Sequence, residues 1–338
     1  MNEIMQTIRD YYAEKKLADI ISIEGLEPSA EAAEALALLP EDMRENKMLP
    51  GYPFPPMLDG CTVVVLGARD GRDAFVASKL VGESGKVIAI EGCARGVEKA
   101  NEAKEQIAHA FGFAKSNVHF VNAIIEDLSA AGIADESVDV VIANCAVSHS
   151  PFKLKVLSEV YRVLKEGGEF YEFDVFCNRR LDPEQKADPA IAGGLLAETG
   201  YDQDFRRTMR KAGWEDFRHM SFHAVEVTDE AAAKAAGEGT TYEGRYVRAV
   251  KSQVIEDLCE QYGQYATYDG KIAGCPDYFD LDDHHRFFTD EPMSVCSNSC
   301  SMVADTRYGA HFKVDGNLRH GAVMRGGDDV EGLEQFHD

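Results

Sequence analysis

The fold is decided by two apolar runs that flank a glycine-containing turn. The first run and the turn read Cys61-Thr-Val-Val-Val-Leu66-Gly67-Ala68-Arg69-Asp70-Gly71-Arg72-Asp73, and the second run reads Val87-Ile-Ala-Ile-Glu91. Between them, residues 73–80 have the amphipathic pattern of a helix. Strand, glycine turn, helix, strand and terminal acid together indicate the βαβ unit of a nucleotide- or nucleoside-binding α/β sheet. Glu91 lies about 20 residues beyond Gly71, where a ribose-binding carboxylate is expected.

Outward from this unit, strands and helices alternate regularly along the chain. We expect further strands at residues 118–122, 138–143 and 169–174, and helices at 97–111, 153–164 and 202–214. Gly167-Gly168 should close the helix at 153–164, because glycine tolerates the left-handed conformation at a helix end. The alternation predicts a doubly wound, mostly parallel sheet whose site lies at the carboxyl ends of its strands.

Composition shifts divide the chain into three parts. Helical patterns at 5–16 and at 29–39, the latter with Ser29 as N-cap, precede a proline-rich extended linker at 49–56. A segment rich in Ala, Glu and Lys at 228–238 marks a boundary before a tail rich in aromatics, Gly, Asp and His. The predicted domains are an N-terminal helical segment with its linker at 1–56, the α/β domain at 57–228 and a small α+β domain at 229–338.

Overall composition excludes several classes of protein. The 338 residues are 45% hydrophobic and 28% charged, as in soluble globular proteins, and no run approaches the roughly 18–20 apolar residues of a membrane helix. A net charge of −24 disfavours binding to nucleic acid or to an anionic membrane surface. The eight scattered cysteines indicate reduced thiols, and the start lacks the apolar core of a secretory signal. We therefore expect a cytoplasmic protein.

Motifs spread over most of the chain are shared with one family. They are Asp10-Tyr11-Tyr12, Pro53-Phe54-Pro55, Gly71-Arg72-Asp73, Gly85-Lys86-Val87, Ser116-Asn117-Val118, Ile125-Glu126, Asn144-Cys145, Gly167-Gly168-Glu169, Asp204-Phe205-Arg206-Arg207, Tyr262-Gly263-Gln264, Leu281-Asp282-Asp283-His284-His285 and Val295-Cys296. The sequence thus resembles the arsenite methyltransferases, which use S-adenosylmethionine. The resemblance implies a Rossmann-like class I methyltransferase sheet with a smaller C-terminal α+β domain.

The resemblance also implies a set of residues that bind S-adenosylmethionine. Glu91 corresponds to the acid that binds the ribose, Ile125-Glu126 to the adenine edge, and Asn144 to the position facing the methyl end. The full predicted cofactor set is Gly67, Gly71, Arg72, Asp73, Glu91, Ile125, Glu126 and Asn144. Simpler interpretations stay open: the glycines serve a tight turn needed only for folding, and Glu91 is a solvated residue at a strand end.

Two departures from the family pattern fall within this turn. The acid that helps to hold the methionine ammonium is Val65 here, and the middle glycine is Arg69. Loss of one charge-assisted hydrogen bond costs about 1.5–3 kcal/mol, or roughly 10- to 100-fold in affinity. Arg69 either enters the cofactor pocket or turns outward. We expect S-adenosylmethionine to bind with reduced affinity or to have lost its site.

The acceptor site differs more. The family binds trivalent arsenic through three cysteine thiolates, which are soft ligands for a soft centre. Only Cys145 matches; the other positions hold Pro50 and Leu195, and residues 19–22 contain no cysteine. One thiolate does not make a three-coordinate site, so arsenite methylation by that mechanism is not expected. Cys145 is alternatively a small buried residue without reactivity.

The predicted catalytic residues are Cys145 and His149, which follow the same strand. Because the unperturbed pKa of histidine lies near working pH, His149 is a candidate general base for a thiol or hydroxyl acceptor, although a loop histidine is commonly just solvated. A metal or thiol site is suggested by Cys275, Cys296, Cys300 and the pair His284-His285. However, the Cys-x₃-Cys spacing of Cys296 and Cys300 is unlike the Cys-x₂-Cys spacing of a zinc knuckle. We interpret them as groups packed in a small domain and predict no metal.

Two functions from different classes remain. In the first, the protein is an S-adenosylmethionine-dependent methyltransferase acting on another small acceptor that needs fewer thiols. In the second, it is an inactive paralogue that binds, regulates or assembles with a protein partner. The methyltransferase is favoured by the retained residues Glu91, Ile125-Glu126 and Asn144-Cys145. The inactive paralogue is favoured by Val65, Arg69 and the missing cysteines.

Overall fold

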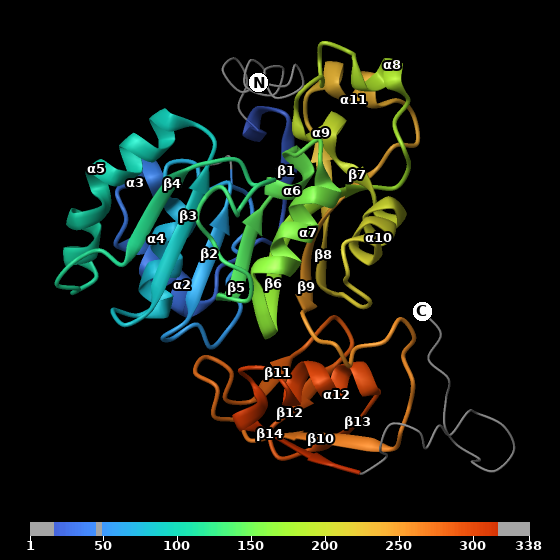
Figure 1. Ribbon diagram of the computed structural model, residues 1–338. Helices are drawn as coiled ribbons and strands as arrows, with labels where there is room; N and C mark the ends of the chain where they lie inside the picture. Colours follow the sequence, from blue (N-terminus) through green and yellow to red (C-terminus); the bar gives the residue numbers. More distant parts are fainter. Residues whose placement is uncertain (1–16, 45–48, 317–338) are drawn as a thin grey trace, which may run out of the picture.

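The centre of the structure is a nine-stranded sheet (Figure 1). The computed structural model describes residues 17–44 and 49–316, so the helix predicted at 5–16 lies outside the described residues. The strand order is β1-β8-β9-β6-β5-β2-β3-β4, with β7 paired to β6. The strands are β1 (Ile21–Ile23), β2 (Thr62–Leu66), β3 (Lys86–Glu91), β4 (Val118–Asn122), β5 (Val138–Asn144), β6 (Leu164–Cys177), β7 (Gly200–Tyr201), β8 (Arg218–Val227) and β9 (Tyr242–Val250).

Adjacent strands from β4 to β6 pair in parallel, which confirms the predicted doubly wound sheet. Beyond β6 the sheet is antiparallel, because β9 pairs antiparallel with β6, β8 with β9, and β1 with β8. The central strands are buried on both faces, as their unbroken runs of Val and Ile require.

Helices cover both faces of the sheet (Figure 1). On one face they are α2 (Ala30–Ala37), α3 (Glu41–Arg44), α4 (Arg72–Val81) and α5 (Ala94–Ala110). On the other they are α6 (Ala146–His149), α7 (Lys153–Val163) and α10 (Asp202–Lys211). A third apolar cluster gathers the 3₁₀ turn at Leu17–Asp19, β1, α9 (Leu195–Glu198) and α11 (Glu230–Ala236), with α8 (Pro183–Lys186) beside α11. Ser29 caps α2 as predicted, since its Oγ accepts the Ala32 N–H at 3.2 Å.

The small C-terminal domain confirms the predicted α+β character. Its strands are β10 (Gln264–Tyr268), β11 (Tyr278–Asp280), β12 (Arg286–Phe288), β13 (Pro292–Val295) and β14 (Phe312–Asp315), joined by α12 (Ser297–Ala304) and the 3₁₀ turn Gly309–His311. β13, β10 and β14 form one antiparallel sheet, and β11 pairs with β12. Buried aromatic rings of Tyr268, Phe279, Tyr308 and Phe312 fill its core.

The division expected at residue 228 falls inside the large sheet. β9 lies between β6 and β8, and the strands of the small domain begin only after it. The Ala-rich segment that suggested a boundary is α11, a helix packed against β8, α8 and α9. The division of the chain into domains at these residues remains a prediction.

A buried ion-pair network joins the small domain to the amino end of β6. Glu169 accepts from Arg248 Nε at 2.6 Å and from the Tyr308 hydroxyl at 2.8 Å, and Arg307 Nη2 lies 2.5 Å from its second oxygen. Burial alone would raise the pKa of Glu169, but Arg307 and Arg248 hold it below its usual value. The small domain is therefore attached at the edge opposite the carboxyl ends of the parallel strands.

The glycine pair at 167–168 lies within β6 and does not cap a helix, contrary to the sequence prediction. α7 ends at Val163, and Leu164 is already extended, with ψ of 139°. Gly167 has φ of +74°, and a Cβ there would lie 2.5 Å from the carbonyl oxygen of Asp305. The missing side chain lets the small domain approach the backbone of β6.

Within residues 17–44 and 49–316, none of the helices combines the length and apolar character that a bilayer crossing demands.

Gly167→Ala should therefore lower the free energy of unfolding by about 2–4 kcal/mol, through left-handed strain plus overlap with Asp305. Gly112→Ala is the matched control, because Gly112 has φ of +85° but open space around its Cβ position. It should cost about 1 kcal/mol from strain alone. Urea unfolding of both variants measures the difference. Equal losses would contradict a close interdomain contact at Gly167.

Candidate functional site

The turn between β2 and α4 adopts left-handed backbone conformations at alternate residues. Gly67 has φ of +64°, Arg69 +52° and Gly71 +102°. A Cβ on Gly71 would lie 2.7 Å from Phe75 Cε2, so this glycine allows close packing of the helix. Arg69 occupies the same backbone region as a glycine would, at a cost of roughly 1–2 kcal/mol for a side chain. The turn geometry is thus retained despite the substitution.

Glu91 ties this turn to the end of β3. Its Oε2 accepts the Arg69 N–H at 2.7 Å and its Oε1 accepts the Cys93 N–H at 2.7 Å. Each carboxylate oxygen keeps a second lone pair. Glu91 therefore shapes the turn and still has acceptor capacity for hydroxyl groups bound beside it.

A buried polar network holds the chain segment before β2 over the carboxyl ends of the strands. Arg72 donates to Leu49 O at 2.6 Å, to Gly51 O at 2.8 Å and, through Nε, to Asp73 at 2.8 Å. Asn144 Nδ2 donates to Gly51 O at 2.8 Å and to Asp73 at 2.9 Å, and its Oδ1 accepts the Gly51 N–H at 3.2 Å. Arg72, Asp73 and Asn144, all predicted to bind the cofactor, come together here; their contact with a cofactor stays a prediction.

The β4–β5 loop is linked to the loop after α6. The hydroxyl of Ser150 donates to Glu126 Oε1 at 2.5 Å, and both residues are buried. The neighbouring Ile125 is half-buried against the apolar cluster beneath the sheet. Ser150 was not foreseen from the sequence, because a serine in a loop carries no distinguishing pattern.

Cys145 follows Asn144 directly, is the N-cap residue of α6 and is completely buried. It has φ of +54°, and its N–H donates to Phe173 O at 2.7 Å. It belongs to the same apolar cluster as Ile20, Ile21 and Leu195. Burial, with a contribution from Asp174, raises the pKa of the Cys145 thiol well above its usual range. The thiol is therefore protonated at neutral pH.

His149 lies one helical turn beyond Cys145. Its Nδ1 hydrogen-bonds the Cys145 carbonyl, which only accepts, so Nδ1 carries the proton in the neutral ring. Burial and then the positive charge of Arg69 lower the pKa of His149 to about 3. The structure thus brings both predicted catalytic residues together with Arg69 at the carboxyl end of β5.

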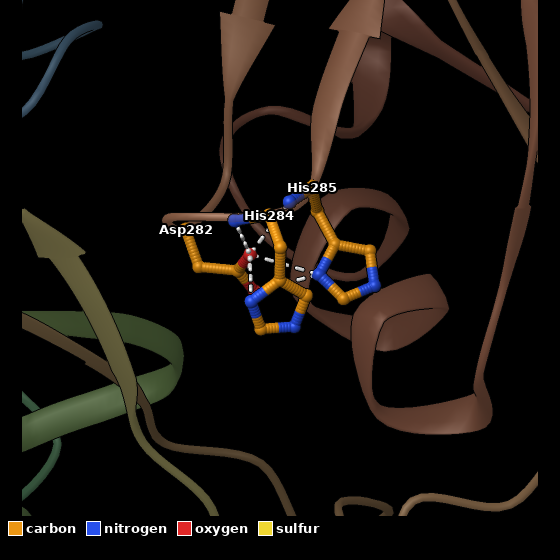
Figure 2. Close-up of side chains that lie close together, drawn as sticks. All are labelled: Asp282, His284 and His285. Carbon is orange, nitrogen blue, oxygen red and sulfur yellow. Dashed lines mark hydrogen bonds and ion pairs between the residues drawn. The ribbon is translucent and has the colours of Figure 1, made fainter. Parts of the chain in front are cut away.

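No three sulfur atoms converge anywhere in residues 17–44 and 49–316, a region that contains all eight cysteines. The described residues do contain one constellation suited to a metal, Asp282, His284 and His285, whose ligand atoms lie within 4.8 Å of one another (Figure 2).

The bonds of Asp282 indicate that it closes a turn. Its Oδ1 accepts the N–H groups of His284 and His285 at 3.1 and 2.7 Å, and His285 Nδ1 lies 2.8 Å from the carboxylate. Arg218 Nη1 is 3.3 Å from Asp282 Oδ2. Because this guanidinium already neutralises the carboxylate, a divalent cation would have to bind beside a fixed positive charge. Cys300 and Cys275 pack in or against the apolar core of the same domain.

A separate cavity of about 490 Å³ opens where β6 ends and β9 begins. Its polar lining includes Tyr201, Asp202, Glu243 and Arg245. None of the residues predicted from the sequence to bind cofactor or catalyse the reaction lines this cavity.

Family models match both parts of the chain. Residues 58–213 match a methyltransferase domain, and residues 262–326 match the arsenite methyltransferase C-terminal domain. The second match covers β11 and β12 and the turn between them that carries Asp282, His284 and His285.

Relatives of known activity match nearly the whole chain. The arsenite methyltransferase of Aquipseudomonas alcaligenes is 40% identical over 277 residues, covering 82% of this chain and 79% of that protein. The human arsenite methyltransferase is 28% identical over 320 residues, covering 92% and 84%. The crystal structure of an arsenic(III) S-adenosylmethionine methyltransferase from Chlamydomonas reinhardtii has 40% identity and a TM-score of 0.83, covering 86% of this chain and 97% of that one. The chain belongs to the arsenite methyltransferase family.

Proposed function

We propose that the protein is an S-adenosylmethionine-dependent methyltransferase that does not bind arsenite through three thiolates. Its acceptor is another small molecule. The observation that carries the proposal is the state of Cys145, which is buried and protonated. By the resemblance, it is also the one cysteine that matches an arsenic ligand of the family. The alternative function, an inactive paralogue that binds a partner, is favoured by Val65 and Arg69 in the cofactor turn.

The residues around the turn fit the nucleoside part of the cofactor. Glu91 has unused acceptor capacity beside a turn whose backbone geometry is preserved, and Ile125 offers an apolar surface at the adjacent loop. Glu91, Gly67 and Ile125 would hold the nucleoside. S-adenosylmethionine, when bound, supplies a methyl group on a positively charged sulfur, and the protein's part is to position the acceptor in line with it.

The residues fit the methionine part less well. Val65 is buried within an apolar cluster, so no carboxylate stands at that place on β2. The positive charge of Arg69 acts on both Cys145 and His149, which locates its field at the same end of the site. A cation there repels the cofactor's ammonium and sulfonium groups. Weakened rather than abolished binding is the expected result.

The acceptor side of the site is apolar. The resemblance implies that Leu195 corresponds to a second thiol of the family. Leu195, Ile20 and Ile21 share the apolar cluster of Cys145. Arsenic binding requires deprotonated sulfur, and the environment of Cys145 opposes ionisation. An acceptor that needs no thiolate cage is compatible with these side chains.

His149 is a weak base in this setting. With a pKa of about 3 it is neutral throughout the physiological range, and it can take a proton only from a strongly acidic group. Its bond to the Cys145 carbonyl suits it to fixing the turn of α6. The proposed transfer therefore relies on positioning more than on acid–base catalysis.

Calorimetric titration with S-adenosylmethionine and S-adenosylhomocysteine tests the proposal. We expect micromolar binding, about tenfold or more weaker in Glu91→Gln and unchanged in Glu98→Gln, an exposed residue of α5. The double variant Val65→Asp/Arg69→Gly should bind about 10- to 100-fold more tightly than the wild type. No binding up to millimolar cofactor in the wild type would instead establish the inactive paralogue.

Incubation with arsenite and S-adenosylmethionine, followed by mass spectrometry of the products, tests the acceptor. We expect no methylarsenical whose formation depends on Cys145. Methylarsenicals that disappear in Cys145→Ser and persist in Cys93→Ser, where the thiol is exposed, would overturn the proposal.

The depressed pKa of His149 makes stability depend on pH. The unfolded chain takes up a proton on this residue below its ordinary pKa of about 6.5, whereas the folded protein does so only near pH 3. Stability from this residue is therefore lost as the pH falls from about 6.5 to about 3. When the pH falls to about 4.5, the free energy of unfolding should drop by about 1–2 kcal/mol less in His149→Gln than in the wild type. Urea unfolding across this range measures it, with the exposed His109→Gln as control; identical profiles for wild type and His149→Gln would refute the assignment.

A further inference from the structure

The cavity of about 490 Å³ at the end of β6 has walls from the sheet and from the start of a helix. Phe176 of β6 lies opposite Glu243 of β9, and Glu243 lies opposite Ala224 of β8. Because residues directly opposite each other in antiparallel strands point to the same face, these three side chains form one wall. Tyr201 and Asp202, where β7 passes into α10, form another. The cavity is large enough to hold a small organic molecule.

The charged groups in the lining of this cavity are one guanidinium and two carboxylates. Arg245 Nε donates to Glu243 Oε2 at 2.7 Å, and Arg245 Nη2 lies 3.5 Å from Asp202 Oδ2. The guanidinium is also flanked by the rings of Phe176 and Phe222, whose centres are 5.3 and 5.2 Å from its central carbon. These contacts fix the position of the positive charge. Since two carboxylates face one guanidinium, the lining keeps one net negative charge.

Basic groups outside the lining do little to offset this charge. Arg180 and Arg207 both bind Asp204, and their side chains are 64% and 59% exposed, so water and salt screen them. Burial and then the charge of Arg245 lower the pKa of His219 to about 4, so its ring is neutral at pH 7. The cavity therefore has a negative potential, in a protein whose overall charge is −24.

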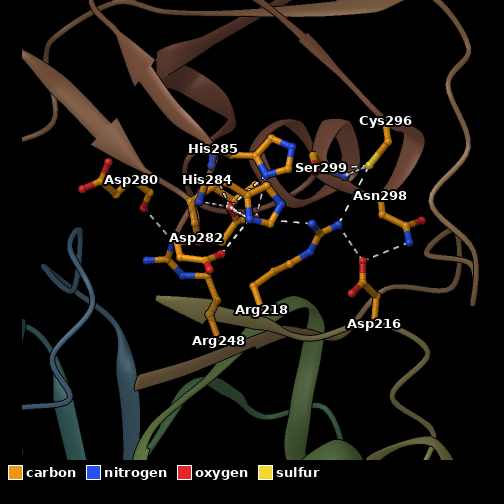
Figure 3. A network of polar contacts seen from close by, with 12 residues as sticks. Asp216, Arg218, Arg248, Asp280, Asp282, His284, His285, Cys296, Asn298 and Ser299 are labelled. Atoms are coloured by element: carbon orange, nitrogen blue, oxygen red, sulfur yellow. Dashed lines mark hydrogen bonds and ion pairs between the residues drawn. The ribbon is translucent and has the colours of Figure 1, made fainter. Parts of the chain in front are cut away.

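A similar group of one guanidinium and two carboxylates, where β8 meets the small domain, is completed by the chain itself (Figure 3). Arg218 bridges Asp216 at 2.7 Å and Asp282 at 3.3 Å. Asn298 Nδ2 donates to Asp216 at 3.0 Å, and two backbone N–H groups donate to Asp282 at 3.1 and 2.7 Å. Further donors of the protein thus satisfy both acids of that group.

The acids of the cavity have no such additional donors. Among the described residues, neither Glu243 Oε1 nor Asp202 Oδ1 accepts a hydrogen bond, and both side chains line the cavity. Their side chains are 39% and 25% exposed, so a ligand that enters the cavity can reach them. An ammonium group has three N–H donors and one positive charge. It supplies both the donors and the charge that the two acids lack.

We propose that this cavity binds a small organic cation that carries a primary ammonium group. The ammonium lies between Glu243 and Asp202, and the apolar body of the ligand lies along Phe176 and Ala224. A bare metal ion would fill only the carboxylate end of a cavity of about 490 Å³ and would leave the aromatic wall unused. The proposal is independent of the proposed function, because none of the residues predicted for cofactor binding or catalysis lines the cavity.

Nuclear magnetic resonance of the full chain, isotopically labelled at its alanine methyl groups, tests the proposal with benzylamine as the probe. Benzyl alcohol, which has nearly the same shape and no charge, is the matched control. The Ala224 signal is identified by its loss in Ala224→Ser. At near-physiological salt concentration, we expect benzylamine to shift this signal saturably and benzyl alcohol to leave it in place.

Charge variants give the affinity a predicted sign. Glu243→Gln should weaken benzylamine binding by about tenfold, because it removes a charge-assisted hydrogen bond and leaves the lining neutral. Arg245→Gln should instead strengthen binding, because the lining then carries two negative charges; damage to the fold would not have this effect. Glu238→Gln, which changes an exposed acid outside the lining, should bind like the wild type.

The proposal is overturned if benzylamine leaves the Ala224 signal of the wild type in place, or if benzyl alcohol shifts it equally. Equal affinity of Glu243→Gln and the wild type, or weaker binding in a folded Arg245→Gln, would also overturn it. If a variant fails to fold, the comparison of benzylamine with benzyl alcohol on the wild type decides the matter alone.

Discussion

The structure depends on the buried contact between the guanidinium of Arg72, the carboxylate of Asp73 and the amide of Asn144. Together they bind the backbone of Leu49 and Gly51, so that an incoming segment is held against the start of α4 and the end of β5. Gly51 sits so close to the ring of Phe173 that a Cβ there would overlap it. Removing one partner from such a buried pair leaves an uncompensated charge, which typically costs 3–5 kcal/mol. This network sets the backbone that presents Cys145 on one side and the glycine turn on the other.

From this common scaffold the two halves of the site have different chemical character. The half formed by the turn and Glu91 keeps its hydrogen-bonding geometry, including a left-handed Arg69 where a glycine would be less strained. The half around Cys145 is apolar, and its one thiol is protonated.

The sequence predicted the parallel half of the fold well, because β2, β3 and β5 are runs of β-branched residues and Ser29 marks a helix start by its own chemistry. The sequence was a poorer guide in regions whose structure is determined by contacts between distant parts of the chain. The predicted boundary placed β9 in the second domain, because nothing in the sequence near β9 indicates that it pairs with β6. Gly167 does not end a helix; its missing side chain lets Asp305 approach the backbone. Glu172 is completely buried, and neither of its side-chain oxygens has a hydrogen-bond partner among the described residues, a placement that no pattern rule anticipates.

Cys145 stands without partner thiolates in an apolar site formed by the described residues. X-ray absorption spectroscopy at the arsenic edge, on protein equilibrated with arsenite and washed, counts the sulfur atoms around bound arsenic directly. We expect no shell of three sulfur neighbours, and a spectrum that is the same for the wild type and Cys145→Ser. A three-sulfur shell in the wild type that loses a sulfur in Cys145→Ser would contradict it.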